Sequence, residues 1–292
     1  MFYDVKLPPI PDTARTAAAM VVLNPSESRR LLGRATAALP EVRRAMQHGT
    51  IIIARGITNA YVTEELLGER VEPKAGLTVG MVCGGVTTGN AGPPATTHHV
   101  IRDGHIVEGA DSREEILTFG PNDVFIKGAN AIDMEGHAGV LTSSLVGGTI
   151  GMAWPVVTSR GSHLIMPVGL EKLVPSVIDA ANHSGIHYFK WTLGLPTRLT
   201  PVVICKVITE IQALGILAGV KATHIASGGV GGSEGAVVLS IEGEEARVEQ
   251  AFALVKSIKG EPPVTTPETV FVRSPADFGY DPAAQLATLK GR

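Results

Sequence analysis

The stretch TIIIARGITNAYVTEELL (residues 50–67) decides the fold. Residues 50–54 form an apolar, β-branched run, which is typical of a strand buried on both faces. Gly56 predicts a turn, and residues 59–67 then predict a helix. A buried strand followed by a glycine turn and a helix is the repeating unit of parallel α/β sheets.

Segments on both sides of this stretch continue the alternation. Upstream, an apolar stripe at helical spacing predicts a helix that begins after a Ser26 or Ser28 cap, and Pro40 separates it from a second helix that ends at Gly49. Downstream, Asp103 and Gly104 predict a hairpin turn. Further strands are expected at 122–128 and 163–168, and helices at 146–158 and 170–181. This order predicts an α/β fold whose open, mainly parallel sheet has helices on both faces.

The pattern changes near residue 185. Expected strands (186–194, 220–229 and 236–243) alternate with expected helices (200–217 and 244–260), which is a ferredoxin-like α+β order, and residues 264–272 would supply the last strand. We therefore expect four parts. They are an N-terminal arm (1–22), an α/β ligand-binding domain (23–184), a smaller ferredoxin-like domain (185–272) and a C-terminal tail (273–292).

The composition makes some classes of function unexpected for this chain. Of 292 residues, 18% are charged and the net charge is −3, without a basic stripe, so a nucleic-acid partner is not expected. Residues 138–159 lack charges but contain glycines, hydroxyls and a proline, which predicts a buried, close-packed segment rather than a membrane span. The N-terminus does not resemble a signal peptide, so we expect a cytoplasmic protein. The low charge content favours a homo-oligomer.

The first candidate ligand site is the turn after the first buried strand. Gly56 allows close approach of a ligand, and Thr58 and Asn59 lie at the start of a helix. Free amides and the helix dipole there suit a phosphate or a carboxylate. The alternative is a plain strand-to-helix turn in which Thr58 or Asn59 caps the helix.

The second candidate is the segment after the strand at 122–128. Lys127 would neutralise an anion, Gly128 follows it, and Asn130 would orient a ligand hydroxyl or carbonyl. Asp133 and Glu135 would act as base or acid if burial raises their pKa values. The alternative is that Asp133 caps a turn and Lys127 lies on the surface.

The third candidate is the glycine-rich start of the expected helix at 146–158. Gly148 and Thr149 would donate amides to a phosphate, or the glycines would let the helix pack tightly on the sheet. A glycine-dense loop at 228–235 predicts either a flexible hairpin or a flap that a ligand or neighbouring subunit approaches.

Residues 24–183 resemble the superfamily of ribose-5-phosphate isomerase A, glucosamine-6-phosphate deaminase and the CoA transferases. The resemblance rests on a helix, a strand, the Gly56-Ile57-Thr58 turn, the segment Asp123-Val124-Phe125-Ile126-Lys127-Gly128-Ala129, and the later Asp133 and Gly136. It implies an isomerase-like or transferase-like fold with a ligand pocket near these residues. The chain carries G-A-N-A-I-D where the isomerases carry an acidic D-G-A-D-E cluster.

Histidines and cysteines predict neither a metal nor a cofactor. His98 and His99 would point to opposite sides of a strand, which makes them poor joint ligands. Cys83 and Cys205 lie far apart in the sequence and are expected to be buried thiols.

These features predict a protein that binds a small anion, namely a phosphorylated or carboxylated metabolite such as a sugar phosphate, a nucleotide or a CoA-like compound. The binding site would lie at the carboxyl ends of the strands. If the protein is an enzyme, we expect an isomerase or transferase that uses a carboxylate base. The alternatives are a non-catalytic metabolite sensor and a structural subunit of an oligomer.

Overall fold

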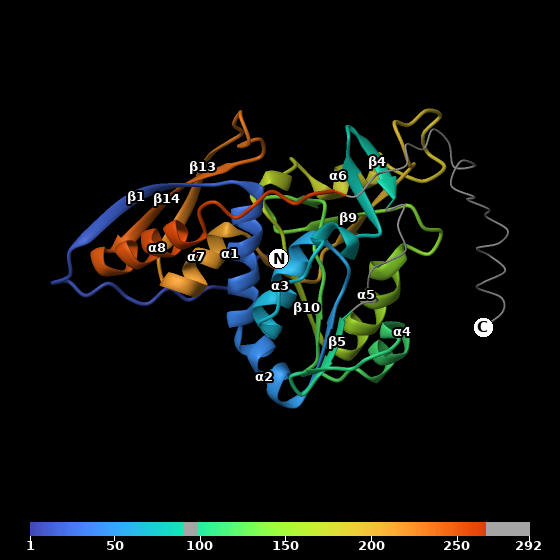
Figure 1. The fold of residues 1–292 in the computed structure, drawn as a ribbon, viewed down its shortest axis with the longest axis horizontal. Coiled ribbons are helices and arrows are strands. Elements are labelled where there is room, and N and C mark those ends of the chain that lie inside the picture. The colour runs from blue at the N-terminus through green and yellow to red at the C-terminus, as the bar shows by residue number, and fades with distance from the viewer. Residues whose placement is uncertain (90–98, 267–292) are drawn as a thin grey trace.

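A computed structural model describes residues 1–89 and 99–266 of the chain. A six-stranded sheet with helices on both sides forms the larger part, and a three-stranded sheet with two helices extends to one side of it (Figure 1). The predicted α/β class is confirmed. Over the described residues, no helix is both long enough and apolar enough to cross a membrane.

The six-stranded sheet has the order β12-β10-β7-β2-β5-β6. Its first four strands are parallel, and β5 and β6 add an antiparallel edge, so the sheet is mainly parallel as predicted. The strands are β2 (Thr50–Ile53), β5 (His99–Arg102), β6 (His105–Ile106), β7 (Val124–Ile126), β10 (His163–Pro167) and β12 (Lys206–Ile208).

Alternating side chains of β2 divide the core into two layers. Ile51 and Ile53 pack in the layer that includes α1 (Pro25–Ala38), whereas Ile52 packs in the layer that includes α5 (Gly148–Arg160). Figure 1 shows these helices on opposite sides of the sheet. Each strand residue is thereby buried, which explains the continuous apolar run in the sequence.

The helices that flank β2 follow the predicted pattern, apart from one cap. The helix α1 is followed by α2 (Pro40–His48), and α3 (Ile57–Leu67) follows the Gly56 turn. However, α1 begins before the expected serine caps, because Asn24 and Glu27 form a capping box.

Gly33 permits the close contact between α1 and α3. A Cβ at this position would lie 3.0 Å from the backbone of Tyr61, tighter than a side chain tolerates without movement.

Two hairpins lie between α3 and β7. The glycine-rich segment after residue 78 forms β3 (Gly80–Cys83) and β4 (Val86–Gly89), which pair antiparallel. The turn between β5 and β6 has Asp103 at φ 48° and Gly104 at φ 83°, which confirms the predicted hairpin. Short helices follow in α4 (Ser112–Glu115) and the 3-10 turn η2 (Ile116–Thr118), and a further 3-10 turn, η1 (Lys74–Leu77), precedes β3.

The region from 170 to 217 differs most from its prediction. The helix expected at 170–181 is the 3-10 turn η3 (Leu170–Lys172) and a separate helix α6 (Val177–Asn182), with Pro175 between them. The prediction of a strand at 186–194 is wrong, because these residues form turns and bends in the structure. A proline in the expected helix interior would break it, which explains the division at Pro175.

The helix expected at 200–217 is wrong in its first half. This segment begins in β11 (Arg198–Val202), which joins β9 (Ala138–Thr142) and β8 (Ala131–Ile132) in an antiparallel sheet. It continues as β12, and only then forms α7 (Glu210–Ala218). Pro201 is incompatible with a helix interior, and the β-branched run after it suits an extended chain.

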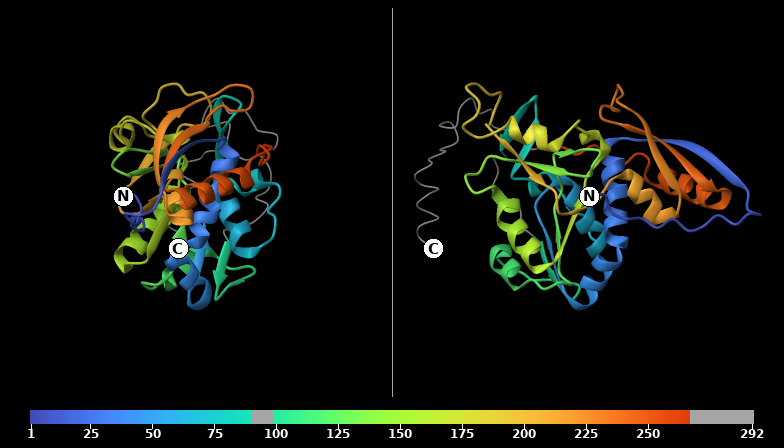
Figure 2. Two further views of the ribbon diagram at one scale, coloured as in Figure 1. Left: turned by 90° about the vertical axis from the view of Figure 1, so that its left-hand side faces the viewer. Right: turned by 180° about the vertical axis from the view of Figure 1, so that it is seen from behind.

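The smaller sheet combines the two ends of the described chain. Its strands are β1 (Thr16–Leu23), β14 (Val237–Glu244) and β13 (Lys221–Ser227), in the order β1-β14-β13. The helices α7 and α8 (Glu245–Ile258) cover one face, as Figures 1 and 2 show. We call these elements the side module.

The side module shows that the pairings cross the predicted divisions of the chain. Residues 16–23, expected in an extended arm, pair along their whole length with β14. Conversely, β12 belongs to the six-stranded sheet although it lies beyond residue 185. The predicted division into four parts stays a prediction, and most of the last strand expected after α8 lies outside the described residues.

Candidate functional site

The parallel strands β2, β7, β10 and β12 end at one edge of the six-stranded sheet. The residues that follow them are Gly56 and Asn59 after β2, Lys127 after β7, Lys172 in the turn after β10, and Glu210 after β12. We call this group the carboxyl edge. Parallel sheets bind ligands at the carboxyl ends of their strands, so this edge is the candidate ligand site.

Asn59 connects the first two of these strands. Its side-chain Nδ2 donates to the carbonyl of Ala54 at 2.6 Å. Its Oδ1 is buried and has no hydrogen-bond partner among the residues that the structure describes. A Cβ placed on Gly128 would lie 3.8 Å from that oxygen and 4.0 Å from the Cβ of Thr58. The structure therefore brings Gly56, Thr58, Asn59 and Gly128 together, with one unused acceptor between them.

Lys127 is partly buried and has an unusual electrostatic environment. Its Nζ donates to the carbonyl of Gly128 at 3.2 Å, and no carboxylate of residues 1–89 or 99–266 forms an ion pair with it. Burial, and then the positive charge of Lys172, lower the pKa of Lys127 to about 8. The positive charge of Lys172 thus acts on Lys127 at the carboxyl edge.

Lys172 lies at the end of η3 among mixed charges. Burial is the main cause that lowers its pKa; Glu171 and Glu210 oppose this shift, and Arg29 adds to it. Glu171 is held by Arg29 at 3.1 Å and lies 3.9 Å from Lys172. Because Glu171 is shared with an arginine, it offsets only part of the positive charge at this edge.

Glu210 is a fully buried carboxyl at the start of α7. Its Oε2 accepts a hydrogen bond from the amide of Leu170 at 2.9 Å, whereas Oε1 has no partner within the described part of the chain. The hydroxyl of Ser28 lies nearby and favours the carboxylate, but burial outweighs it and raises the pKa of Glu210. Since Glu210 is 0% exposed, it has no contact with solvent.

Asp133 and Glu135 lie in a separate turn. Asp133 is buried, and its Oδ1 accepts from the amides of Glu135 and His137 at 3.2 and 2.9 Å. Its Oδ2 accepts from the amide of Val177 at 2.9 Å and lies 3.2 Å from Nδ1 of His137. Burial alone would raise the pKa of Asp133, but these hydrogen bonds lower it. This geometry fits the alternative interpretation from the sequence, in which Asp133 caps a turn. Proton transfer by Asp133 or Glu135 stays a prediction.

The same turn is one place where three potential metal ligands meet. Oxygen or nitrogen atoms of Asp133, Glu135 and His137 lie within 4.8 Å of one another. Both oxygens of Asp133 already accept hydrogen bonds from the protein, which reduces their availability to a cation. This cluster is therefore explained by the turn itself.

The remaining predicted residues lie in other contacts. Asn130 is exposed, and its Oδ1 accepts from the amide of Leu141 at 3.0 Å, which ties the strand end to β9. A Cβ on Gly148 would meet Thr142 and Ser144, and Thr149 is half-buried in the first turn of α5. These contacts do not connect Gly148 and Thr149 with Lys127, so their anion role stays a prediction.

Two further sequence features can be located. The glycine-dense loop at 228–235 returns to the carboxyl edge, because a Cβ on Gly235 would lie 3.3 Å from Oε2 of Glu171. His99 pairs with Ile53 at the same edge and has a buried Nε2 without a described partner; burial lowers its pKa. His98 lies outside the described residues.

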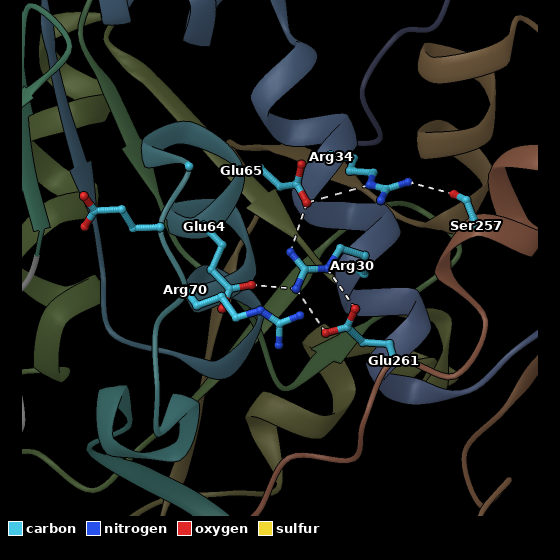
Figure 3. A pocket seen from close by; sticks show the side chains of 9 residues that line it. Arg30, Arg34, Glu64, Glu65, Arg70, Ser257 and Glu261 are labelled. Atoms are coloured by element: carbon cyan, nitrogen blue, oxygen red, sulfur yellow. Dashed lines mark hydrogen bonds and ion pairs between the residues drawn. The ribbon is translucent and has the colours of Figure 1, made fainter.

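A second polar site lies between α1, α3 and the segment after α8. Arg30 donates to Glu64 at 2.6 Å, to Glu65 at 3.0 Å and through two nitrogens to Glu261 at 3.0 Å (Figure 3). We call these four residues the Arg30 cluster. It borders a cavity of about 470 Å³, which Arg34 and Arg70 also line.

The charges of the Arg30 cluster are mutually satisfied. Desolvation would lower the pKa of Arg30, but its three glutamate partners raise it overall. Lys74 also pairs with Glu64 at 2.8 Å. The cluster has no unpaired buried group to offer a ligand, so its contacts favour a structural role that joins α1, α3 and the chain after α8.

Sequence reasoning found Lys127 but missed Lys172 and Glu210. Lys172 was placed inside an expected helix, and Glu210 inside another. A signal for Glu210 was present, because Thr209 and Gln212 form a capping box directly after a β-branched run, which is typical of a strand-to-helix junction. Comparisons with protein-family models, curated proteins and solved structures find no match to this chain.

Proposed function

We propose that this protein binds a small metabolite through its carboxylate or phosphate group at the carboxyl edge of the six-stranded sheet. Lys127 carries the proposal, since it is a partly buried cation without an ion-pair partner in the described chain. An unpaired buried charge is costly, and a ligand anion would remove that cost.

Lys172 supports the same ligand class. Its positive charge acts on Lys127, and its neighbour Glu171 is shared with Arg29. Two ammonium groups at one edge would both bind an anion with several oxygens, as phosphate and carboxylate have. The resemblance to the isomerase and CoA-transferase superfamily points to the same class of ligand and stays a prediction.

The test is a ligand panel measured by thermal unfolding and calorimetry. It contains inorganic phosphate, sugar phosphates, nucleotides, CoA thioesters and small carboxylates. A ligand at about 100 times its Kd adds about 2.7 kcal/mol of stability, which raises Tm by several degrees in a chain of this size. We expect Lys127→Met and Lys172→Met each to weaken binding at least about tenfold, because each removes a charge-assisted contact.

Lys221→Met is the matched control. Lys221 is an exposed lysine of the side module that pairs with Glu242, so its removal changes the net charge equally but leaves the carboxyl edge intact. Binding that Lys221→Met weakens as much as Lys127→Met does would indicate a general charge effect. A panel without any stabilising anion would contradict the proposal.

A further inference from the structure

Lys127 differs from other lysines of the described chain in its partners. Buried Lys74 pairs with Glu64 at 2.8 Å, and this carboxylate favours its charged amine. Lys206, which is more exposed, pairs with Glu41 at 2.6 Å. Lys127 has only a carbonyl acceptor and a neighbouring cation. A neutral amine can donate that same hydrogen bond to the carbonyl of Gly128, so the site tolerates the uncharged form.

A lysine amine becomes a nucleophile when it is neutral near physiological pH. Withdrawal from water and a second cation are the two features that produce this state. Both act on Lys127: burial is the larger cause of its shifted pKa, and Lys172 is the smaller. Lys172 in turn lies among Glu171, Arg29 and Glu210, which together set its charge.

Lys127 is half-buried as a residue, and it follows β7 at the carboxyl edge rather than lying within the core. The next residue is Gly128, which adds no side chain beside the amine. With Lys172 at the same edge, one lysine is left for the anion of a small molecule and the other for a second group of that molecule.

We propose that the ε-amine of Lys127 forms an imine with an aldehyde or keto group of the anionic ligand. The nitrogen bonds to the carbonyl carbon, and one amine proton moves to the oxygen to give a carbinolamine. Loss of the hydroxyl group and the second amine proton as water then leaves the carbon–nitrogen double bond. The inference rests on the proposed function and restricts its substrate class to carbonyl compounds that carry a carboxylate or phosphate.

The test traps the imine by reduction. The full chain is incubated with pyruvate or with glyceraldehyde 3-phosphate and sodium cyanoborohydride at pH 7.5, and modified lysines are located by peptide mass mapping. We expect Lys127 to be labelled about 100-fold faster than Lys221, because burial and the nearby Lys172 favour the neutral amine of Lys127 at this pH. Equal labelling rates at the two lysines would overturn the inference.

Two variants separate nucleophilic chemistry from simple anion binding. Lys127→Arg keeps the positive charge but cannot form an imine, so it should abolish the label at this position, whereas Lys221→Met, which lies outside the site, should leave both the label at Lys127 and phosphate binding unchanged. Lys172→Met should move the pH profile of Lys127 labelling to higher pH, since it removes the neighbouring cation. A purely structural role for Lys172 would leave that profile unchanged.

Phosphate binding is measured in parallel by calorimetry, so that the two proposals fail separately. Binding of phosphate without faster labelling of Lys127 overturns the imine and leaves the anion site. Absence of both binding and labelling overturns both proposals.

Discussion

The Arg30 cluster and the carboxyl edge both hold charged side chains away from water, but their partners differ. Arg30 meets three glutamates, and its hydrogen bonds connect two helices with the chain after α8. Lys127 and Lys172 lie near each other without a carboxylate for Lys127, and Glu210 has an unused oxygen. Paired charges hold a fold together, whereas unpaired charges at a strand end are available to a ligand.

Replacement of Arg30 is the most direct test of this comparison. Replacement of Arg30 by alanine leaves Glu261 without its ion-pair partner and Glu64 with only Lys74, in a poorly solvated site. We expect a loss of about 3–5 kcal/mol in unfolding free energy, measured by denaturant titration. Arg34→Ala is the control, because Arg34 is more exposed and reaches Glu65 only at 3.7 Å. Its expected loss is about 1 kcal/mol or less, and equal losses would contradict a special role for Arg30.

Asp133 is a second buried charge whose partners lie within the protein, and its replacement tests the same comparison. Asp133→Asn replaces one accepting oxygen with an amide NH2 group, which cannot accept the hydrogen bond that the backbone amide of Val177 donates, and we expect a loss of about 1–3 kcal/mol in unfolding free energy. Because the pKa of Asp133 is lowered in the folded state, its stabilisation is present above the ordinary value of 3.8 and is lost as pH falls below it. In denaturant titrations from about pH 6 down to about pH 2.5, the wild type should therefore lose its stability advantage over the variant.

Glu135→Gln separates structure from chemistry in the same turn. Glu135 is exposed, so we expect a change within about 0.5 kcal/mol in unfolding free energy. If Glu135→Gln destabilised the chain as much as Asp133→Asn, the turn-capping explanation of Asp133 would be wrong.

Lys127 should behave in the opposite way. Lys127→Met removes an unpaired, partly buried cation, and we expect stability at pH 7 to rise, on the order of 1 kcal/mol. The folded pKa of about 8 lies below the unfolded value, so wild-type stability should rise with pH from about 8 to about 10.5 and the variant should lack this rise. Lys206→Met is the control; it breaks a pair with Glu41 and should destabilise the chain. A destabilised Lys127→Met would contradict the comparison.

Replacement of Glu210 should change stability less than replacement of Arg30 or Asp133. Its pKa is raised by burial, so the folded state holds a proton that the unfolded state releases, and stability falls as pH rises above the ordinary 4.5. Glu210→Gln should remove that fall and gain up to about 1 kcal/mol at pH 7 in denaturant titrations. A parallel pH dependence in wild type and variant would show that Glu210 is ionised in the folded chain.

Sequence patterns predicted the elements whose signals are local. Pro40 divides two helices, Asp103 and Gly104 form the hairpin turn, and β2 and β7 are buried runs with a glycine close behind. Each of these signals acts within a few residues, so no knowledge of distant contacts is needed.

The errors arose where distant partners decide the structure. The apolar segment 200–217 suits a buried strand or a helix equally by periodicity, and pairing with β9 and β10 makes its first half extended. The 186–194 segment has aromatic residues but, among the described residues, pairs only through an isolated bridge between Gly194 and Thr87, which is too short to make it a strand. Strand identity there depends on neighbours that the local pattern does not reveal.

The candidate site was predictable in part for the same reason. Lys127 follows a recognisable buried strand, so its place at the carboxyl edge could be anticipated. Lys172 and Glu210 join it only because β10 and β12 lie next to β7 in the sheet order, which local patterns do not determine. The two interpretations of Asp133, base or cap, use the same side chain, and only its hydrogen bonds distinguish them.

The pairing of β1 with β14 has a consequence for the order in which the chain folds during synthesis. Leu23 pairs with Val237, so β1 leaves the ribosome long before its partner strand exists. At about 5–20 residues per second, translation of the intervening segment takes roughly 10–40 s. During that time an apolar strand, TAAAMVVL, has no neighbour to cover its backbone. The side module therefore closes last, and a nascent chain should need protection of its N-terminal strand until α8 has been made.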